Sequence, residues 1–524
     1  MEPAAKDGRT SLAGAAGTVA GLTLASRISG LGRDMVFAAF FGAGAAADAF
    51  NIAYTIPNVF RRLLGEGATS MAFVPVFSEW KTNHSTEECR RLYGVTFGWF
   101  SLILFLVTLA GILASPLLVR LFAPGFEEER YRLAVLLNRW VFPYLFLVGV
   151  TAVLTGMLHT HRHFALPAAV PIFLNLGTVA GVWLLESRLH PPVLSLAIGV
   201  LAGGTLGVFS LIPALRSHEI YFRPSLERGH PGIKRMLRLM APALFGVAVY
   251  QINILVSRAL ASLLGKGAVT YIYYSDRFLE LPLGVFAVSV ATVALPSLSA
   301  EAAAGKLQQV RATLQQALRL TLLVCLPATV WLAACRLPLY STLLERGQFT
   351  AADSLATARV FLFAALGIPF IAAIRNLAPV FYSLQDTRTP VLIAFFSFLI
   401  NAALAVSLMG PLGPAGLTLA NTLSALFQAG YLALKLRRRL DGLGLAAMTR
   451  WMARLGLACV PMALLCWPLA GLELWRGGSE LAKFSALAGL GAASVATFLL
   501  AARLMRLEEI GQLMGGLSRR LRRR

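Results

Sequence analysis

Charged side chains interrupt an apolar stretch near the start of the chain. Between residues 27 and 66 lie four arginines, two aspartates and a glutamate: Arg27, Arg33, Asp34, Asp48, Arg61, Arg62 and Glu66. A charge near the centre of a bilayer costs at least ~2.5–3.5 kcal/mol, so such residues are functional candidates. Guanidinium groups donate paired hydrogen bonds to oxyanions. A cavity lined by these arginines would therefore suit a multiply charged anion such as a diphosphate.

A second charged group, Asp276, Arg277 and Glu280, occupies a matching place later in the chain. In each half a glycine-rich turn is followed by a charged helix and then a proline, with Gly44 and Pro75 in the first half and Gly267 and Pro296 in the second. A proline followed 32 residues later by an asparagine also occurs in both halves, as Pro143 and Asn175 and as Pro369 and Asn401. This order predicts an internal duplication.

Structural ion pairs are the alternative explanation for some of these charges. Arg62 and Glu66 have i, i+4 spacing, and Arg277 and Glu280 have i, i+3 spacing, so each pair could satisfy itself on one helix. Asp34 is expected to orient or partly neutralise neighbouring arginines. We therefore predict that Arg27, Arg33, Asp34, Arg61 and Arg277 bind substrate, with support from Asp48, Arg62, Glu66, Asp276 and Glu280.

The composition is that of a polytopic membrane protein. Of the 524 residues, 57% are hydrophobic and 14% charged, and the mean hydropathy is +0.70, whereas a soluble chain carries about 25% charged residues. The net charge of +22 does not indicate nucleic-acid binding, because the arginines lie mostly between apolar runs. Basic loops on such a chain indicate the cytoplasmic face and its anionic lipids.

Charge-free runs long enough to span a bilayer follow one another along the chain. The clearest are Gly94–Val119, Trp140–Leu158, Phe164–Leu185, Pro191–Leu215, Leu239–Ser257, Leu281–Ala300, Leu455–Leu472 and Phe484–Ala502. The glycine- and proline-rich segment 410–416 is expected to divide the long run between Arg388 and Lys435 into two spans.

Weaker spans around 320–344 and 360–382, with charged segments at about 12–39 and 46–78, bring the predicted number of transmembrane helices to 14. Basic residues are expected on alternate loops, which places both termini in the cytoplasm. These loops and the tail carry Lys81, Arg90, Arg91, Arg216, Arg223, Arg228, Lys234, Arg235, Arg238, Lys435, Arg437, Arg438, Arg439, Arg519, Arg520, Arg522, Arg523 and Arg524.

The duplication predicts two six-helix lobes around a central cavity, at residues 1–222 and 223–442. Residues 443–524 would add helices 13 and 14 and a basic cytoplasmic tail. Transporters built from parallel repeats bind substrate between the lobes and expose it alternately to either side.

Several motifs resemble those of the MurJ (MviN) lipid II flippases. They are Ser26-Arg27-Ile28-Ser29-Gly30-Leu31-Gly32-Arg33-Asp34, Phe41-Gly42-Ala43-Gly44, Asp48-Ala49-Phe50, Pro57-Asn58-Val59-Phe60-Arg61-Arg62, Glu66-Gly67-Ala68, Ala72-Phe73-Val74-Pro75, Ala123-Pro124-Gly125-Phe126, Tyr273-Tyr274-Ser275-Asp276-Arg277 and the run from Ala378 to Pro390. The resemblance covers nearly the whole chain. It implies a fold of the multidrug/oligosaccharidyl-lipid/polysaccharide exporter superfamily.

The resemblance also implies a function in cell-wall synthesis. The expected substrate is lipid II, the undecaprenyl-diphosphate-linked disaccharide-pentapeptide, moved from the inner to the outer leaflet of the bacterial inner membrane by alternating access. Family residues match Arg27, Arg33, Arg61 and Arg277, with Asp34, Asp48 and Glu66 in support. Helices 13 and 14 would form the groove for the lipid tail. Membrane lipids and the peptidoglycan synthesis machinery are the expected partners, and neither nucleic acid nor a cofactor is expected.

One feature departs from the family pattern. Some relatives hold sodium with carboxylates from helices 7, 11 and 12, whereas the corresponding segments here offer Gln251, Asn253, Asn401, Asn421 and Thr422 but no acid. A hard cation prefers several oxygen ligands that include charge. We therefore expect the membrane potential, rather than sodium, to drive transport.

Other sequence features carry less weight. The alternating histidines His159, His161 and His163 lack metal-ligand spacing and predict a solvated loop, and no metal site is expected. Residues 301–319 predict an amphipathic linker on the inner membrane surface. The five scattered cysteines form no disulfide framework.

Four other functions remain open from the sequence. One is a flippase for another polyprenyl-diphosphate-linked glycan, and a second is a multidrug or cation antiporter, whose cavity should carry acids rather than arginines. The third is a polytopic glycosyltransferase, which would need a carboxylate or histidine on a sizeable outer loop. A scaffold for cell-wall assembly, the fourth, would leave the buried charge unexplained.

Overall fold

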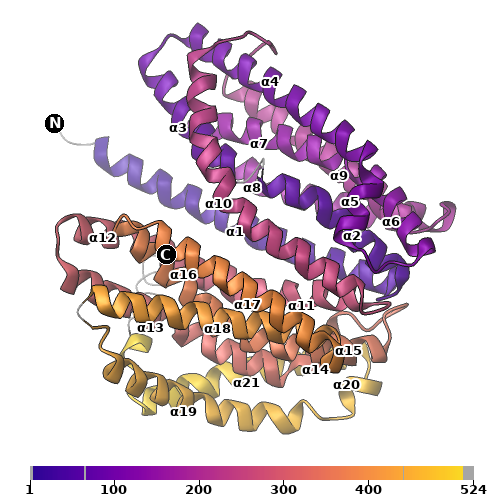
Figure 1. Ribbon diagram of the computed structural model, residues 1–524, viewed down its shortest axis with the longest axis vertical. Coiled ribbons are helices and arrows are strands. Elements are labelled where there is room, and N and C mark those ends of the chain that lie inside the picture. Colours follow the sequence, from indigo (N-terminus) through magenta and orange to yellow (C-terminus); the bar gives the residue numbers. More distant parts are fainter. Residues whose placement is uncertain (1–3, 64–66, 441, 512–524) are drawn as a thin grey trace. The chain divides into compact units, whose positions relative to one another are not determined.

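The computed structural model describes residues 4–63, 67–440 and 442–511, and every regular element within these ranges is a helix (Figure 1). The helices form two compact units, Met1–Val269 and Thr270–Arg524. The predicted all-helical class is therefore confirmed.

The first unit contains long helices interspersed with shorter ones. They are α1 (Ala4–Phe41), α2 (Ala45–Arg61), α3 (Gly67–Asn83), α4 (Thr86–Leu113), α5 (Ser115–Phe122), α6 (Glu128–Val141), α7 (Tyr144–Thr160), α8 (Ala165–Leu185), the short η2 (Glu186–Arg188), α9 (Leu194–Ser217) and α10 (Pro231–Ser262). Helix α8 packs against α9 and α1, and α10 packs against α3 and α5.

Glycines bring α8 and α9 into backbone contact. A Cβ added at Gly177 would lie 2.3 Å from the Cα of Gly203, and one at Gly181 would lie 2.5 Å from the Cα of Gly199. Small residues four positions apart allow helix backbones to approach closely inside membranes, where packing drives association. Helices α8 and α9 therefore pack closely against each other, and α8 also packs against α1.

The second unit repeats much of this order. It contains α11 (Ala268–Pro282), whose first turn begins in the first unit, η3 (Leu283–Ala287), α12 (Val288–Ala303), α13 (Leu307–Ala334), α14 (Arg336–Leu343), α15 (Ala351–Leu366), α16 (Ile368–Ser383), α17 (Arg388–Leu412), α18 (Pro414–Arg439), α19 (Leu445–Leu469), α20 (Leu474–Gly477) and α21 (Glu480–Leu504).

The two units share a succession of helix lengths. Helices α4 and α13 each have 28 residues, and the short helices α5 and α14 that follow them each have 8. Pairs of medium helices come next in both units, α6 and α7 in the first and α15 and α16 in the second. The order of elements thus supports the internal duplication inferred from the sequence.

The charged helices that begin this succession are interrupted in both units. Helix α2 ends at Arg61 and α3 begins at Gly67, and between α11 and α12 lies the π-helical turn η3. Such π-helical turns within helices often occur at functional sites.

Eleven segments of the described chain are long and apolar enough to cross a membrane. They overlap all of the clear charge-free runs except Leu239–Ser257, which lies within the 32-residue α10. The predicted division at 410–416 is confirmed, because α17 ends at Leu412 and α18 begins at Pro414. Gly413 between them has φ +58°, a conformation that glycine adopts without strain.

The amphipathic linker predicted over 301–319 is wrong. Helix α12 continues to Ala303, and after a turn α13 begins at Leu307 and continues unbroken into the membrane-length helix. Val310 and Leu314 are fully buried in a cluster with Phe381. The apolar face of this segment therefore packs against protein, not against the membrane surface.

The predicted C-terminal helix pair, α19 and α21, packs together and against α13. Leu455 and Cys466 from α19, with Phe498 from α21, belong to one buried cluster with Leu322 of α13. The pair is thus joined to the second unit by a continuous apolar core.

Candidate functional site

Helix α1 presents two arginines in different surroundings. Arg27 is exposed and has no hydrogen-bond or ion-pair partner in the part of the chain that the structure describes. Arg33 donates to Asp34, with Nη2 and Oδ1 2.7 Å apart, and their side chains are 11% and 7% exposed. Asp34 therefore orients a neighbouring arginine, as predicted, and that arginine is Arg33.

Helix α8 fixes α1 beside these charges. The Asn175 side chain donates to the backbone oxygen of Ser26 and to Oγ of Ser29, at 3.2 and 2.9 Å. A Cβ at Gly30 would lie 3.5 Å from the amide nitrogen of Asn175, whereas Gly32 faces open space. The hydrogen bonds of Asn175 thus hold in place the turn of α1 that lies between Arg27 and Arg33.

Arg33 and Arg61 both act on a buried tyrosine at the start of α7. The rings of Tyr144 and Tyr54 stack with centroids 5.8 Å apart, and their side chains are hydrogen-bonded. The charges of Arg61 and Arg33 both reach Tyr144 electrostatically. Arg61 also donates through Nε to Oδ1 of Asn58 at 2.9 Å. Helices α1, α2 and α7 therefore gather two of the predicted arginines around one tyrosine pair.

Arg62 directly follows the end of α2. Arg62 is half-buried, and Glu66 lies outside the described residues. Their predicted i, i+4 pair therefore remains a prediction.

Asp48 lies apart from this group, in a buried contact of its own. Its Oδ2 is 3.8 Å from Nη1 of Arg130 on α6 and accepts a 2.6 Å hydrogen bond from the backbone N–H of Gly267. Arg130 also donates to the backbone oxygen of Gly265 at 3.3 Å. Asp48 and Arg130 are 0% and 4% exposed. The two side chains thus hold α2, α6 and the turn before α11 together.

In the second unit, Arg277 is exposed on α11 and is held by an aromatic residue. Its Nη2 donates to the Tyr273 hydroxyl at 2.8 Å, and the guanidinium lies 5.0 Å from the ring centroid of the same residue. The expected i, i+3 pair with Glu280 is wrong, since Glu280 makes no ion pair within the described chain. Helical side chains lean toward the N-terminus, which brings Arg277 onto the preceding turn that carries Tyr273. Asp276 is exposed beside it.

The sequence did not single out Arg130, Tyr54 or Tyr144, and it gave Tyr273 only as part of a motif. Three consecutive glutamates, which are typical of a solvated surface, precede Arg130, although the helix begins among them at Glu128. Tyr54 and Tyr144 are single aromatic residues in apolar helices, and nothing in their spacing distinguishes them.

These features define the class of the protein. Many membrane-length helices, with ionisable side chains held among them, are characteristic of a multi-pass membrane transporter. Within the described residues no cluster of three or more histidine, cysteine or acidic side chains could hold a metal ion.

Comparison with known proteins identifies the family. The family model "Lipid II flippase MurJ" matches residues 37–483. A Vibrio cholerae protein named probable lipid II flippase MurJ is 36% identical over 499 residues, covering 92% of this chain and 94% of its own. The Burkholderia cenocepacia lipid II flippase MurJ is 35% identical and covers 80% and 83%. This chain belongs to the MurJ lipid II flippase family.

Solved structures agree with the assignment. A lipid II flippase MurJ in an inward closed conformation superposes with a TM-score of 0.77 at 27% identity, covering 95% of this chain and 99% of that one. An inward-facing multidrug transporter of the MATE family, in the MOP superfamily, gives a TM-score of 0.64 at 14% identity. The second likeness shows the shared fold alone.

Proposed function

We propose that this protein is a lipid II flippase, a transporter and not an enzyme, in the bacterial inner membrane. The observation that carries the proposal is the likeness to MurJ flippases over nearly the whole chain. The substrate is lipid II, which the protein moves from the inner to the outer leaflet for peptidoglycan synthesis.

The proposed architecture has 14 transmembrane helices. The eleven membrane-length segments supply most of them, and α1, the α2–α3 pair and α10 supply the rest. Residues 1–222 and 223–442 form two lobes around a central cavity, and residues 443–524 add the last pair and the tail. Both termini lie in the cytoplasm, because basic residues gather on alternate loops and at the C-terminus.

Arg27, Arg33, Arg61 and Arg277 bind the diphosphate and sugars of the substrate in this proposal. The local contacts support it, because Arg33 and Arg61 gather around the tyrosine pair Tyr54 and Tyr144. Arg33 pairs with Asp34 on α1, and Arg277 donates to the Tyr273 hydroxyl on α11.

Asp34 and the tyrosine pair Tyr54 and Tyr144 set the position of Arg33 and Arg61. Asp48, by contrast, is assigned a structural role with Arg130, since that pair bridges two helices and is buried. Arg62, Glu66, Asp276 and Glu280 keep the supporting role proposed from the sequence.

The membrane potential is the proposed driving force, with no cofactor. Moving one charge across 100 mV changes its free energy by about 2.3 kcal/mol, and the substrate carries charge. Helices α10, α17 and α18, which correspond to the sodium-binding helices of some relatives, contain no aspartate or glutamate. Enzymes that polymerise lipid II outside the cytoplasm would take up the product, and are the proposed functional partners.

Depletion of the protein from cells tests this function. After depletion, lipid II should accumulate in the inner leaflet and disappear from the outer leaflet, as measured by labelling with an impermeant reagent. Normal outer-leaflet lipid II together with halted polymerisation would overturn the proposal and favour an enzyme or a scaffold.

A further inference from the structure

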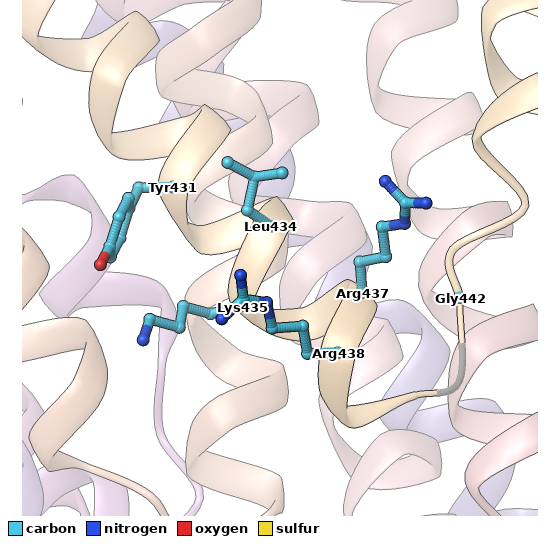
Figure 2. A pocket seen from close by; sticks show the side chains of 6 residues that line it. All are labelled: Tyr431, Leu434, Lys435, Arg437, Arg438 and Gly442. Atoms are coloured by element: carbon cyan, nitrogen blue, oxygen red, sulfur yellow. The ribbon is translucent and has the colours of Figure 1, made fainter.

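A basic cavity lies at the end of α18. Its volume is about 610 Å³, and it is lined by Tyr431, Leu434, Lys435, Arg437, Arg438 and Gly442. Figure 2 shows the Lys435 and Arg438 side chains extending toward Tyr431, with Arg437 on the side of Gly442. Half of the lining residues are therefore cationic.

These three cations have no acidic partner in the described chain. The Lys435 ammonium lies 5.5 Å from the ring centroid of Tyr431. Arg439, by contrast, pairs with Asp386 and lies over the ring of Phe381. Arg439 thus contributes to packing within the unit, whereas Lys435, Arg437 and Arg438 line the cavity with positive charge.

In the sequence Asp441 directly precedes Gly442, and it lies outside the described residues. With its charge counted in full, the cavity retains a surplus of positive charge. Unpaired basic side chains in a confined space attract an anion, and arginine forks match the oxygens of a phosphate group.

The far wall of the cavity is held in place by side chains from α13. Gln315 donates through Nε2 to the backbone oxygen of Leu443 at 2.7 Å, and Leu443 is buried in the core. Gly442 and Gly444 have φ +102° and +58°, and a Cβ at Gly444 would lie 2.9 Å from Nη2 of Arg311. Residues 442–444 are therefore held in place, and they pass beside a further arginine.

An apolar track leads along α18 to this cavity. Leu423, Leu426, Tyr431 and Leu434 are 37%, 46%, 41% and 55% exposed, although they lie on a membrane-length helix. Their spacing places them along the outward side of the helix. An apolar surface of this kind faces the hydrocarbon core of a bilayer. The cavity at the end of the helix is therefore at the level of the lipid headgroups.

We propose that this cavity binds the phosphodiester headgroup of an anionic phospholipid whose acyl chains lie along the exposed side of α18. Lys435 and Arg438, which extend to the same side of the cavity (Figure 2), hold the phosphate oxygens, Arg437 supplies a third charge, and Tyr431 and Leu434 contact the glycerol and the first methylenes. None of these residues belongs to the proposed substrate site. The ligand is thus a resident lipid of the membrane and not the transported molecule.

Lipid retention tests the proposal directly. The purified protein is placed in phosphatidylcholine nanodiscs containing a minor fraction of phosphatidylglycerol, and bound lipid is counted by native mass spectrometry. The triple variant K435Q/R437Q/R438Q should bind phosphatidylglycerol about a hundredfold more weakly, because each basic residue near an anionic surface contributes about fivefold. The matched triple R216Q/R223Q/R228Q removes the same charge from another basic loop and should bind nearly as well as the wild type.

Two results would overturn the proposal. Equal losses in both triple variants would show a diffuse basic surface without a site. Displacement of phosphatidylglycerol from the wild type by excess inorganic phosphate would show a site for a soluble anion. If the triple variant fails to fold, R438Q alone should weaken binding about fivefold, and unchanged binding by R438Q would also contradict the proposal.

Discussion

Asp48 and Arg130 in the first unit occupy the same helix positions as Tyr271 and Asp353 in the second. Asp48 and Tyr271 are the fourth residues of α2 and α11, and Arg130 and Asp353 are the third residues of α6 and α15. The first pair is a buried ion pair, and the second is a hydrogen bond from the Tyr271 hydroxyl to Oδ1 of Asp353 at 2.9 Å. Corresponding helices of the two units therefore make a contact at the same positions with different chemistry.

The two contacts differ in the other groups that stabilise each carboxylate. Asp48 has no solvent exposure, so its charge requires Arg130 and the backbone N–H of Gly267. Asp353 already caps its own helix, accepting from the backbone N–H and the hydroxyl of Thr350 at 2.9 and 2.8 Å. Loss of one partner should therefore be costly in the first unit and mild in the second.

The largest expected effect on stability is that of Arg130→Ala. Removing the counter-ion of a buried charge costs about 3–5 kcal/mol. Thermal unfolding of the purified variant in detergent should show a large fall in the melting temperature. The double variant D48N/R130Q removes both charges and should lie closer to the wild type. A melting curve for Arg130→Ala that overlays the wild type would refute the ion-pair assignment.

Tyr271→Phe should have a smaller effect. It removes one hydrogen bond to a carboxylate that keeps its other donors, at a cost of about 1.5 kcal/mol. The same melting assay measures it, and Tyr271→Phe should melt between Arg130→Ala and the wild type. If Tyr271→Phe were the more damaging of the two, the comparison between the units would fail.

The smallest effect is expected of Tyr273→Phe, which frees Arg277 from its hydrogen bond without removing the arginine. Less precise placement of the guanidinium should slow lipid II transport about threefold, corresponding to one modest hydrogen bond. The rate at which lipid II appears in the outer leaflet measures this change, and the melting temperature should not move. A large loss of stability instead would make Tyr273 a packing residue only.

Local features of the fold could be predicted from the sequence. The glycine at position 413 marked the division of the long apolar run, because a left-handed turn ends a helix at little cost for glycine. The pairing of Asp34 with an arginine was also predictable, since the possible partners lie on the same helix.

Contacts over long sequence separations were not predictable. Arg130 meets Asp48 only because α6 packs on α2, and its acidic neighbours suggested solvent. The 301–319 segment has the pattern of a surface helix, but its apolar side faces Phe381 and not lipid. An amphipathic pattern shows that one face is covered, and it does not show whether protein or membrane covers it.

The arginines proposed to bind substrate differ from those, such as Arg130, that bridge helices. Outer-leaflet lipid II in cells whose only copy carries Arg27→Ala tests this most directly, with protein level and melting temperature measured in parallel. Arg27 has no partner within the described residues, so we predict normal stability and amount, with lipid II trapped in the inner leaflet. Wild-type levels of outer-leaflet lipid II in that strain would contradict the account.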